Sequence, residues 1–217
     1  MADPHPLRAV LAGVTPQCCP NRLNFHCHTL CSDGSLEPQQ LAAQAVHLGL
    51  EHLAVTDHHS VAAHAVVAAE LDRRRALGAV VPTLWTGVEI SCLLSGCLVH
   101  VLALGFDLHA PALQPYLGQR AAVGAELQAD AVRRAIHAAG GLVLLAHPAR
   151  YRLPYGPLLR AAADLGFDGA EAWYDYGQQA QWSPTPLVCE AIATRLAEYG
   201  LLQSCGTDTH GLELCGR

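Results

Sequence analysis

The chain has 217 residues, a formal net charge of −6 at pH 7, and 51% hydrophobic against 15% charged residues. This length predicts one domain, and the composition is typical of a compact α/β protein with buried strands, which excludes a disordered or fibrous chain. The negative charge argues against duplex nucleic-acid binding, and the absence of lysine excludes a Schiff-base or P-loop lysine.

The first half of the chain predicts strands and helices in alternation. Prolines at positions 4, 6, 16 and 20 predict that residues 1–21 form a loosely ordered lead-in, so that the domain spans residues 22–217. Strands are expected at 23–28 and 51–56, and helices at 36–48 and 61–77. Residues 80–92 and 97–106 predict two strands joined by a hairpin, the one antiparallel step in the series.

The second half continues the same pattern. Residues 111–139 predict one long helix, with an interruption near Gly118 and Gly124. Strands are expected at 142–146, 169–174 and 201–205, and helices at 157–165 and 185–199. This alternation favours an α/β fold with a parallel sheet, most economically a closed or nearly closed barrel.

The cysteines and apolar runs indicate the cellular compartment and whether the chain enters a membrane. The nine cysteines are an odd number without a Cys-x-x-Cys pair, and no secretory signal pattern opens the chain, so we expect a reducing, cytoplasmic setting. The longest apolar runs, such as 140–146, are far shorter than the roughly 20 residues that cross a membrane. We therefore expect no association with a membrane.

The stretch from His26 to Asp33 contains three potential metal ligands. On a strand, residues two apart point to the same face, so His26 and His28 can bind one cation together. Asp33 follows in a turn marked by Ser32 and Gly34. A single His-x-His is explained about equally well by chance, so the interpretation depends on further ligands elsewhere.

Further potential ligands recur where predicted strands end. In β/α barrels the catalytic groups lie at these carboxyl ends. His58, Glu89, His147, Asp208 and His210 each follow or end an apolar strand, whereas His100 lies inside the strand at 97–106. Imidazole and carboxylate without thiolate suit Mn, Zn or Fe, and a carboxylate can bridge two ions.

The ordered set resembles the PHP (polymerase and histidinol phosphatase) family of metal-dependent phosphoesterases. The matching motifs, within residues 22–211, are His26-Cys27-His28 with Asp33, Thr56-Asp57-His58, residues 87–91 around Glu89, His100, His147-Pro148, and residues 206–210. The resemblance implies a distorted (β/α)7 TIM-like barrel with two to three divalent ions. By that resemblance one ion is held by His26, His28, Glu89 and Asp208, a second by Glu89, His100 and His147, and a third by Asp33, His58 and His210.

Other residues are expected to assist this chemistry. A hydroxide bridging two ions would attack the phosphorus, which makes Glu89 and Asp208 catalytic. Arg150 is the phosphate-binding candidate because a guanidinium can bind two phosphate oxygens, although a plain salt bridge at the rim is the alternative. Asp57 is expected to accept a hydrogen bond from a metal-binding histidine, whereas Arg120, Arg133 and Arg134 on the long helix are weaker phosphate candidates.

Resemblance to one branch of the family narrows the range of substrates that we expect. Residues 25–34 and 145–151 resemble nucleoside 3′,5′-bisphosphate phosphatases and 5′-end RNA exonucleases, but their inserted segment between the His100 and His147 motifs and their closing C-terminal helix are missing. We expect hydrolysis of a small phosphomonoester, either a nucleotide or a short RNA end. The alternatives are a histidinol-phosphate phosphatase, which shares the ligand set, and a non-catalytic metal-binding regulatory module, which the complete ligand set disfavours.

Overall fold

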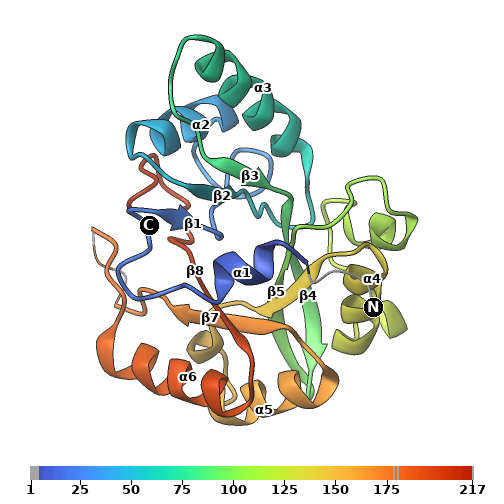
Figure 1. The fold of residues 1–217 in the computed structure, drawn as a ribbon. Helices are drawn as coiled ribbons and strands as arrows, with labels where there is room; N and C mark the ends of the chain where they lie inside the picture. Colours follow the sequence, from blue (N-terminus) through green and yellow to red (C-terminus); the bar gives the residue numbers. More distant parts are fainter. Residues whose placement is uncertain (1–4, 178, 180, 217) are drawn as a thin grey trace.

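Two sheets form the centre of the molecule, as shown by a computed structural model that describes residues 5–177, 179 and 181–216 (Figure 1). The first is wholly parallel and contains β1 (Leu23–Asn24), β2 (His52–Ala54) and β3 (Thr83–Trp85). The second contains, in spatial and chain order, β4 (Gly87–Leu94), β5 (Cys97–Leu104), β6 (Leu142–Leu145), β7 (Gly169–Trp173) and β8 (Leu202–Cys205). The chain therefore has the predicted α/β fold with parallel strands.

Helices follow most of the strands and cover the sheets. They are α1 (Leu7–Leu11), α2 (Pro38–His47), α3 (Ala62–Ala76), α4 (Ala129–Ala138), α5 (Tyr155–Leu165) and α6 (Pro186–Glu198), with 3-10 turns η1 (Pro111–Tyr116), η2 (Gly124–Leu127) and η3 (Pro148–Arg150). The pair α2 and α3 lies beside the three-stranded sheet, and α5 and α6 lie at the opposite end of the molecule (Figure 1). Among the described helices, none combines the length and apolar character needed to cross a bilayer.

Two antiparallel pairs, rather than the one expected, interrupt the parallel order. Strands β4 and β5 form a hairpin through Ser95 and Gly96, whose φ values of 52° and 72° are typical of a tight two-residue hairpin turn. β5 lies between β4 and β6 and is antiparallel to both. The expectation of a single antiparallel step was wrong because one reversed strand inside a sheet creates two such pairs.

The two sheets meet in two places, one beside β1 and β8 and one where the chain after β2 reaches β4. At the first, the N–H of Phe25 donates to the carbonyl of Cys205 at 3.1 Å, and Cys27 forms a parallel bridge with Thr209. At the second, His58 bridges to Glu89. A Cβ at Gly87 would lie 2.6 Å from the carbonyl oxygen of Val55, so this close approach requires glycine.

The N-terminal segment packs against the domain, in contrast to the loosely ordered lead-in that its prolines predict. Leu7 and Leu11 of α1 belong to the main hydrophobic core and have exposures of 0% and 1%. The ring of His5 bonds to the carbonyl of Gly105 at 2.9 Å, and Arg8 pairs with Asp168. The described part of this segment therefore contributes buried apolar surface to the fold.

The helix predicted over 111–139 is interrupted near Gly118 and Gly124, as expected, but its first part is not an α-helix. The segment contains η1, a loop at 117–123, η2, and only then α4 from Ala129. Gly124 adopts a φ of 64°, and Pro115 inside η1 lacks the N–H that an α-helix would need there. As a result Arg120 lies on a loop, not on a helix.

Candidate metal centre

All nine side chains expected to bind metal come together at one end of the strands. A cavity of about 420 Å³ is lined by Asp33, His58, Glu89, His100, His147, Arg150, Tyr151, Asp208 and His210. His26 and His28 lie beneath it, fully buried, with ligand atoms close to those of Glu89 and Asp208. Residues that span almost the whole sequence therefore meet at one site, as the strand-end pattern predicts.

Four of these side chains form a buried group around one point. Nε2 of His26 lies 3.1 Å from Oε2 of Glu89 and 3.3 Å from Oδ1 of Asp208. Nε2 of His28 lies 3.1 Å and 3.2 Å from the same two oxygens. Donor atoms about 3 Å apart are the spacing expected around an ion with ligands at roughly 2.0–2.2 Å.

The hydrogen-bond geometry also fits a cation at this point. Nε2 of His28 is buried and, among the described residues, has no hydrogen-bond partner of acceptable geometry. A buried polar atom without a partner is costly, and a bound ion would satisfy it. The donor set of two imidazoles and two carboxylates therefore fits a divalent metal ion.

The local chain conformation presents the two histidines together. The regular strand β1 ends at Asn24, earlier than expected, but the N–H of His28 donates to the carbonyl of Thr209 and keeps the segment extended. The rings of His26 and His28 lie 5.2 Å apart, while Cys27 between them is buried on the opposite side. A Cβ at Gly206 would lie 2.2 Å from Cβ of His26, so glycine is required there.

Glu89 divides its two oxygens between two sets of imidazoles. Oε2 faces His26 and His28, and also lies 3.5 Å from Nδ1 of His58. Oε1 lies 3.0 Å from Nδ1 of His100 and 3.2 Å from Nε2 of His147. This division is the arrangement required of a carboxylate that bridges two ions.

A third group surrounds Asp33 at the rim of the cavity. Its Oδ2 lies 3.2 Å from Nε2 of His210 and 3.7 Å from Nε2 of His58, and its Oδ1 lies 3.6 Å from Nδ1 of His28. The Asp33 side chain is 55% exposed, unlike the fully buried first group. This group is therefore the one most open to solvent.

Attraction between the buried imidazoles and carboxylates shifts the pKa values of several of these groups. Burial alone would raise the pKa of Glu89, but His26 and hydrogen bonds from the surrounding histidines hold this pKa well below its usual range. Burial alone would lower the pKa of His28, yet Asp208 and Glu89 raise it to about 9. In contrast, burial lowers the pKa of His58 to about 4. Because a metal binds neutral imidazole, an ion held by the first group would have to displace any proton that His28 carries between its ring and these carboxylates.

Arg150 lies on the cavity wall, next to a tyrosine. Its Nη1 donates to the hydroxyl of Tyr174 at 2.9 Å and to Oδ2 of Asp208 at 3.0 Å, and Tyr174 donates to the same carboxylate oxygen at 2.5 Å. Arg150 therefore makes the salt bridge that sequence reasoning held as an alternative, while it also lines the cavity as a phosphate ligand must.

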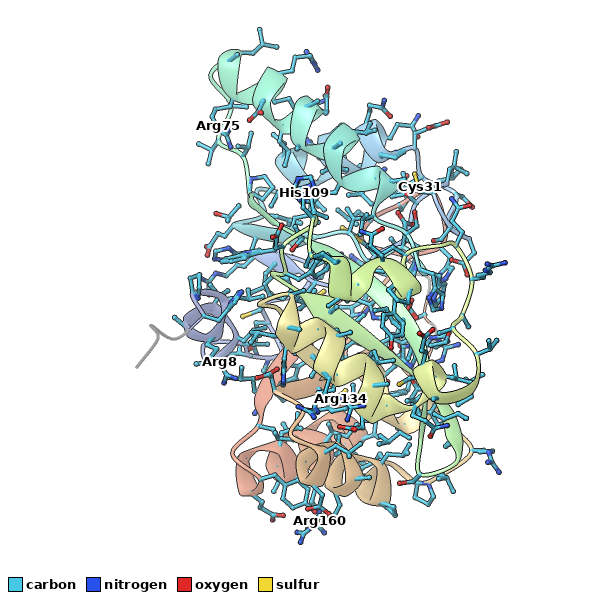
Figure 2. All side chains as sticks on the ribbon, turned by 90° about the vertical axis from the view of Figure 1, so that its right-hand side faces the viewer. Arg8, Cys31, Arg75, His109, Arg134 and Arg160 are labelled. Carbon is cyan, nitrogen blue, oxygen red and sulfur yellow. The ribbon has the colours of Figure 1, made fainter. Side chains whose placement is uncertain are left out.

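The other arginine candidates have partners away from the cavity or lie outside a helix. Arg133 and Arg134 pair with Asp130 on α4. Three consecutive arginines on α3, Arg73, Arg74 and Arg75, likewise pair with Glu70 or Asp72 on the same helix. Arg75 and Arg134 lie at the outer surface (Figure 2). They form solvated helix faces, as expected for charge runs.

Comparison with known proteins identifies the family. Residues 24–147, more than half of the chain, match the PHP domain. The chain belongs to the PHP family. Among curated relatives, it is 34% identical over 97 residues to the 5′-3′ exoribonuclease Rnm of Salmonella typhimurium and 30% identical over 189 residues to a 5′-3′ exoribonuclease of Haemophilus influenzae. These matches cover 45% and 79% of this chain but only 32% and 64% of the relatives.

Solved structures share the fold of this PHP-family chain. A protein classed as an amidohydrolase from Chromobacterium violaceum has a TM-score of 0.71 at 21% identity, with 88% of each chain covered. A protein assigned as a metal-dependent phosphoesterase from Bifidobacterium adolescentis has a TM-score of 0.67 at 24% identity, again with 88% of each chain covered. At these identities the likeness concerns the fold alone.

Asp57 plays a different part in this PHP-family site from the one expected. Its carboxylate accepts hydrogen bonds of 2.7 Å from the N–H and hydroxyl of Thr29 and from the hydroxyl of Ser32, rather than from a histidine. It thus anchors the loop that carries Asp33. The side chain of Asp57 positions that loop and does not line the cavity.

Glu171 occupies the role that sequence reasoning gave to Asp57. This fully buried residue of β7 lies with Oε1 3.0 Å from Nδ1 of His26, and its Oε2 accepts the N–H of His147 at 2.7 Å. Sequence reasoning missed it, although a lone carboxylate within the apolar run 169–173 was a usable signal, because glutamate is rarely buried without a partner.

His59 follows the candidate ligand His58 and is buried, with 5% exposure. Its Nδ1–H donates to the carbonyl of Tyr116 at 3.2 Å, and its Nε2 accepts the N–H of Ser91 at 3.3 Å. Its ring therefore holds the end of η1 against β4.

Proposed function

We propose that this chain is a metal-dependent phosphoesterase that hydrolyses a small phosphomonoester, either a nucleotide or a short oligonucleotide end, into inorganic phosphate and an alcohol. One observation carries the proposal: the two oxygens of Glu89 face separate sets of imidazoles, at 3.0–3.2 Å from His26, His28, His100 and His147. A site that only stabilises the fold needs one closed tetrahedral set, whereas this one is extended and opens into a cavity.

The ligand groups suggest how two or three ions of Mn, Zn or Fe would be held. The first would bind His26, His28, Glu89 and Asp208, the second Glu89, His100 and His147, and the third Asp33, His58 and His210. When bound, such ions supply positive charge to the phosphoryl oxygens and acidify a water so that it can act as nucleophile. His58 lies near both Glu89 and Asp33, so it could serve either neighbouring ion.

The protein's own side chains then orient the substrate. Arg150 would bind phosphoryl oxygens with those N–H groups that do not already contact Tyr174 and Asp208. Tyr174 and Asp208 fix the guanidinium at the cavity wall. Glu171 orients His26 and the chain at His147, so that their ring nitrogens face Glu89.

The same proposal includes a distorted barrel as the scaffold. The contacts between Phe25 and Cys205, and between His58 and Glu89, support a ring in which both sheets take part. A barrel of this kind places all strand ends that bear ligands around one opening.

The substrate class rests on the relatives. Two curated relatives are named 5′-3′ exoribonucleases, and one from Eggerthella lenta, 36% identical over 97 residues, is named a phosphoribosyl 1,2-cyclic phosphate 1,2-diphosphodiesterase. The chain spans only 35% of that enzyme. Nucleotide-like esters are therefore the first substrates to test.

Profiling of phosphate release tests the proposal. Metal-loaded protein would be assayed with 4-nitrophenyl phosphate, adenosine 5′-monophosphate, a short 5′-phosphorylated RNA and histidinol phosphate. We expect turnover of the aryl ester and preference for a nucleotide or RNA end. Turnover of histidinol phosphate alone would replace our substrate class with that alternative, and no turnover of any ester by protein with at least two bound ions would favour a non-catalytic module.

A further inference from the structure

A second cavity adjoins the metal centre. It has a volume of about 500 Å³ and is lined by Leu30, Cys31, Ser32, Asp33, His58 and Gln119. Asp33 and His58 also line the first cavity, so the two spaces meet at these side chains. Arg150 lines only the first cavity, so phosphate binding there leaves the second cavity for another part of the substrate.

Gln119 is held at this cavity by an unusual backbone arrangement. Its φ is 57°, and its N–H donates to the carbonyl of His59 at 3.0 Å. His59 itself has a φ of 51°, and its N–H donates to the carbonyl of Glu89 at 2.9 Å. Such conformations are costly for residues other than glycine, and they persist where the surrounding structure enforces them, often at functional sites. Gln119 is thereby fixed relative to the neighbouring ligand His58.

Leu30 brings an exposed apolar side chain to the same cavity. It is 54% exposed although it lies on a well-anchored loop, where its N–H donates to the carbonyl of Leu36 at 3.0 Å. The loop is further held by Asp57 through Thr29 and Ser32. The apolar surface is therefore preorganised, which lowers the entropic cost of binding a ligand against it.

The chemistry of the lining indicates the kind of group that fits. None of the six lining residues is an arginine or lysine, and the one basic side chain among them, His58, is a candidate metal ligand, so the lining offers no free cationic side chain to a second phosphate. The amide of Gln119 can both donate and accept hydrogen bonds, and Leu30 offers a surface for a flat ring. An uncharged ring that carries both donors and acceptors, such as a nucleobase, matches these features.

We propose that the second cavity receives the alcohol half of the phosphoester, and that Gln119 and Leu30 select a nucleoside over a small aliphatic alcohol. The inference rests on the proposed function, because the first cavity must hold the phosphate. It assigns substrate selection to two residues outside the metal ligands. Leu30 belongs to the loop that Asp57 anchors, and Gln119 belongs to a loop whose backbone bonds to that of His59.

A comparison of two substrates distinguishes selection of the alcohol half from an effect on catalysis in general. The ratio of kcat/KM for adenosine 5′-monophosphate to that for glycerol 3-phosphate would be measured in wild type, Gln119→Ala and Leu30→Ser. We expect the ratio to fall about tenfold in each variant, the loss of roughly one hydrogen bond or one apolar contact. Gln39→Ala and Leu187→Ser, at exposed positions on α2 and α6, serve as matched controls and should keep the wild-type ratio.

A binding measurement keeps the inference independent of turnover. Calorimetry with adenosine should show binding that Gln119→Ala weakens several-fold, and adenosine should compete with the nucleotide substrate. Failure of all phosphate esters to react would refute the proposed function. The binding of adenosine would still test whether the second cavity receives a nucleoside. An unchanged ratio in both cavity variants, together with equal adenosine affinity in wild type and Gln119→Ala, would overturn the inference.

Discussion

Replacing Glu171 by glutamine tests how far the centre depends on a residue that touches no substrate. The carboxylate is fully buried and accepts two hydrogen bonds, from the ring of His26 at 3.0 Å and from the N–H of His147 at 2.7 Å. Glutamine keeps the shape but has only one acceptor oxygen, so one of these donors must face an NH2 group. A buried donor left without a partner costs about 1–3 kcal/mol, which should appear as a lower free energy of unfolding of the metal-free protein.

The same substitution should weaken metal binding. Loss of an outer hydrogen-bond partner typically lowers metal affinity or activity by about 10–100-fold, or roughly 1.4–2.8 kcal/mol. The assays are urea unfolding of chelated protein and titration of Mn or Zn into it. Glu190→Gln, at an exposed site on α6, should change neither quantity. Metal affinity within twofold of wild type in Glu171→Gln, with only stability reduced, would refute the positioning role.

Four further substitutions probe the ligands, the phosphate contact and the core. Glu89→Gln and Asp208→Asn should each lower turnover of 4-nitrophenyl phosphate by more than about 100-fold, because loss of a metal ligand should matter more than loss of its outer hydrogen-bond partner. Thermal unfolding of both variants should stay cooperative. Retained activity would remove the bridging role. Arg150→Gln should lower kcat/KM by about 10–100-fold, the cost of charge-assisted hydrogen bonds, and an unchanged value would leave Arg150 as a plain salt bridge. Leu11→Ala should cost about 2–5 kcal/mol in urea unfolding, because Leu11 is buried in the main core; a loss below 0.5 kcal/mol would show that α1 is dispensable.

The convergence of the candidate metal ligands could be predicted because their placement at strand ends follows from local rules. Apolar runs predict strands, and parallel strands bring their carboxyl ends to one edge, so His58, His147 and Asp208 had to lie near one another. The alternation of side chains along an extended segment likewise placed His26 and His28 together, with Cys27 on the other side. These inferences required no knowledge of which distant segments of the chain contact one another.

Features that depend on contacts between distant segments could not be predicted in the same way. The hydrogen bond from His26 to Glu171 joins residues 145 positions apart, and spacing alone did not distinguish Glu171 from Asp57 as its partner. The burial of Leu7 and Leu11 likewise depends on a surface formed by later strands. In contrast, the interruption near Gly124 could be predicted locally, and Pro115 is a further local signal that the segment before it does not continue as an α-helix.

Titration of a chelated sample with metal tests the central claim most directly. Release of 4-nitrophenol from 4-nitrophenyl phosphate would be followed as Mn or Zn is added back, with bound ions counted per chain. The account predicts no release from chelated protein and release that rises once at least two ions are bound per chain. Full turnover without bound ions, or no turnover with all sites loaded, would contradict it.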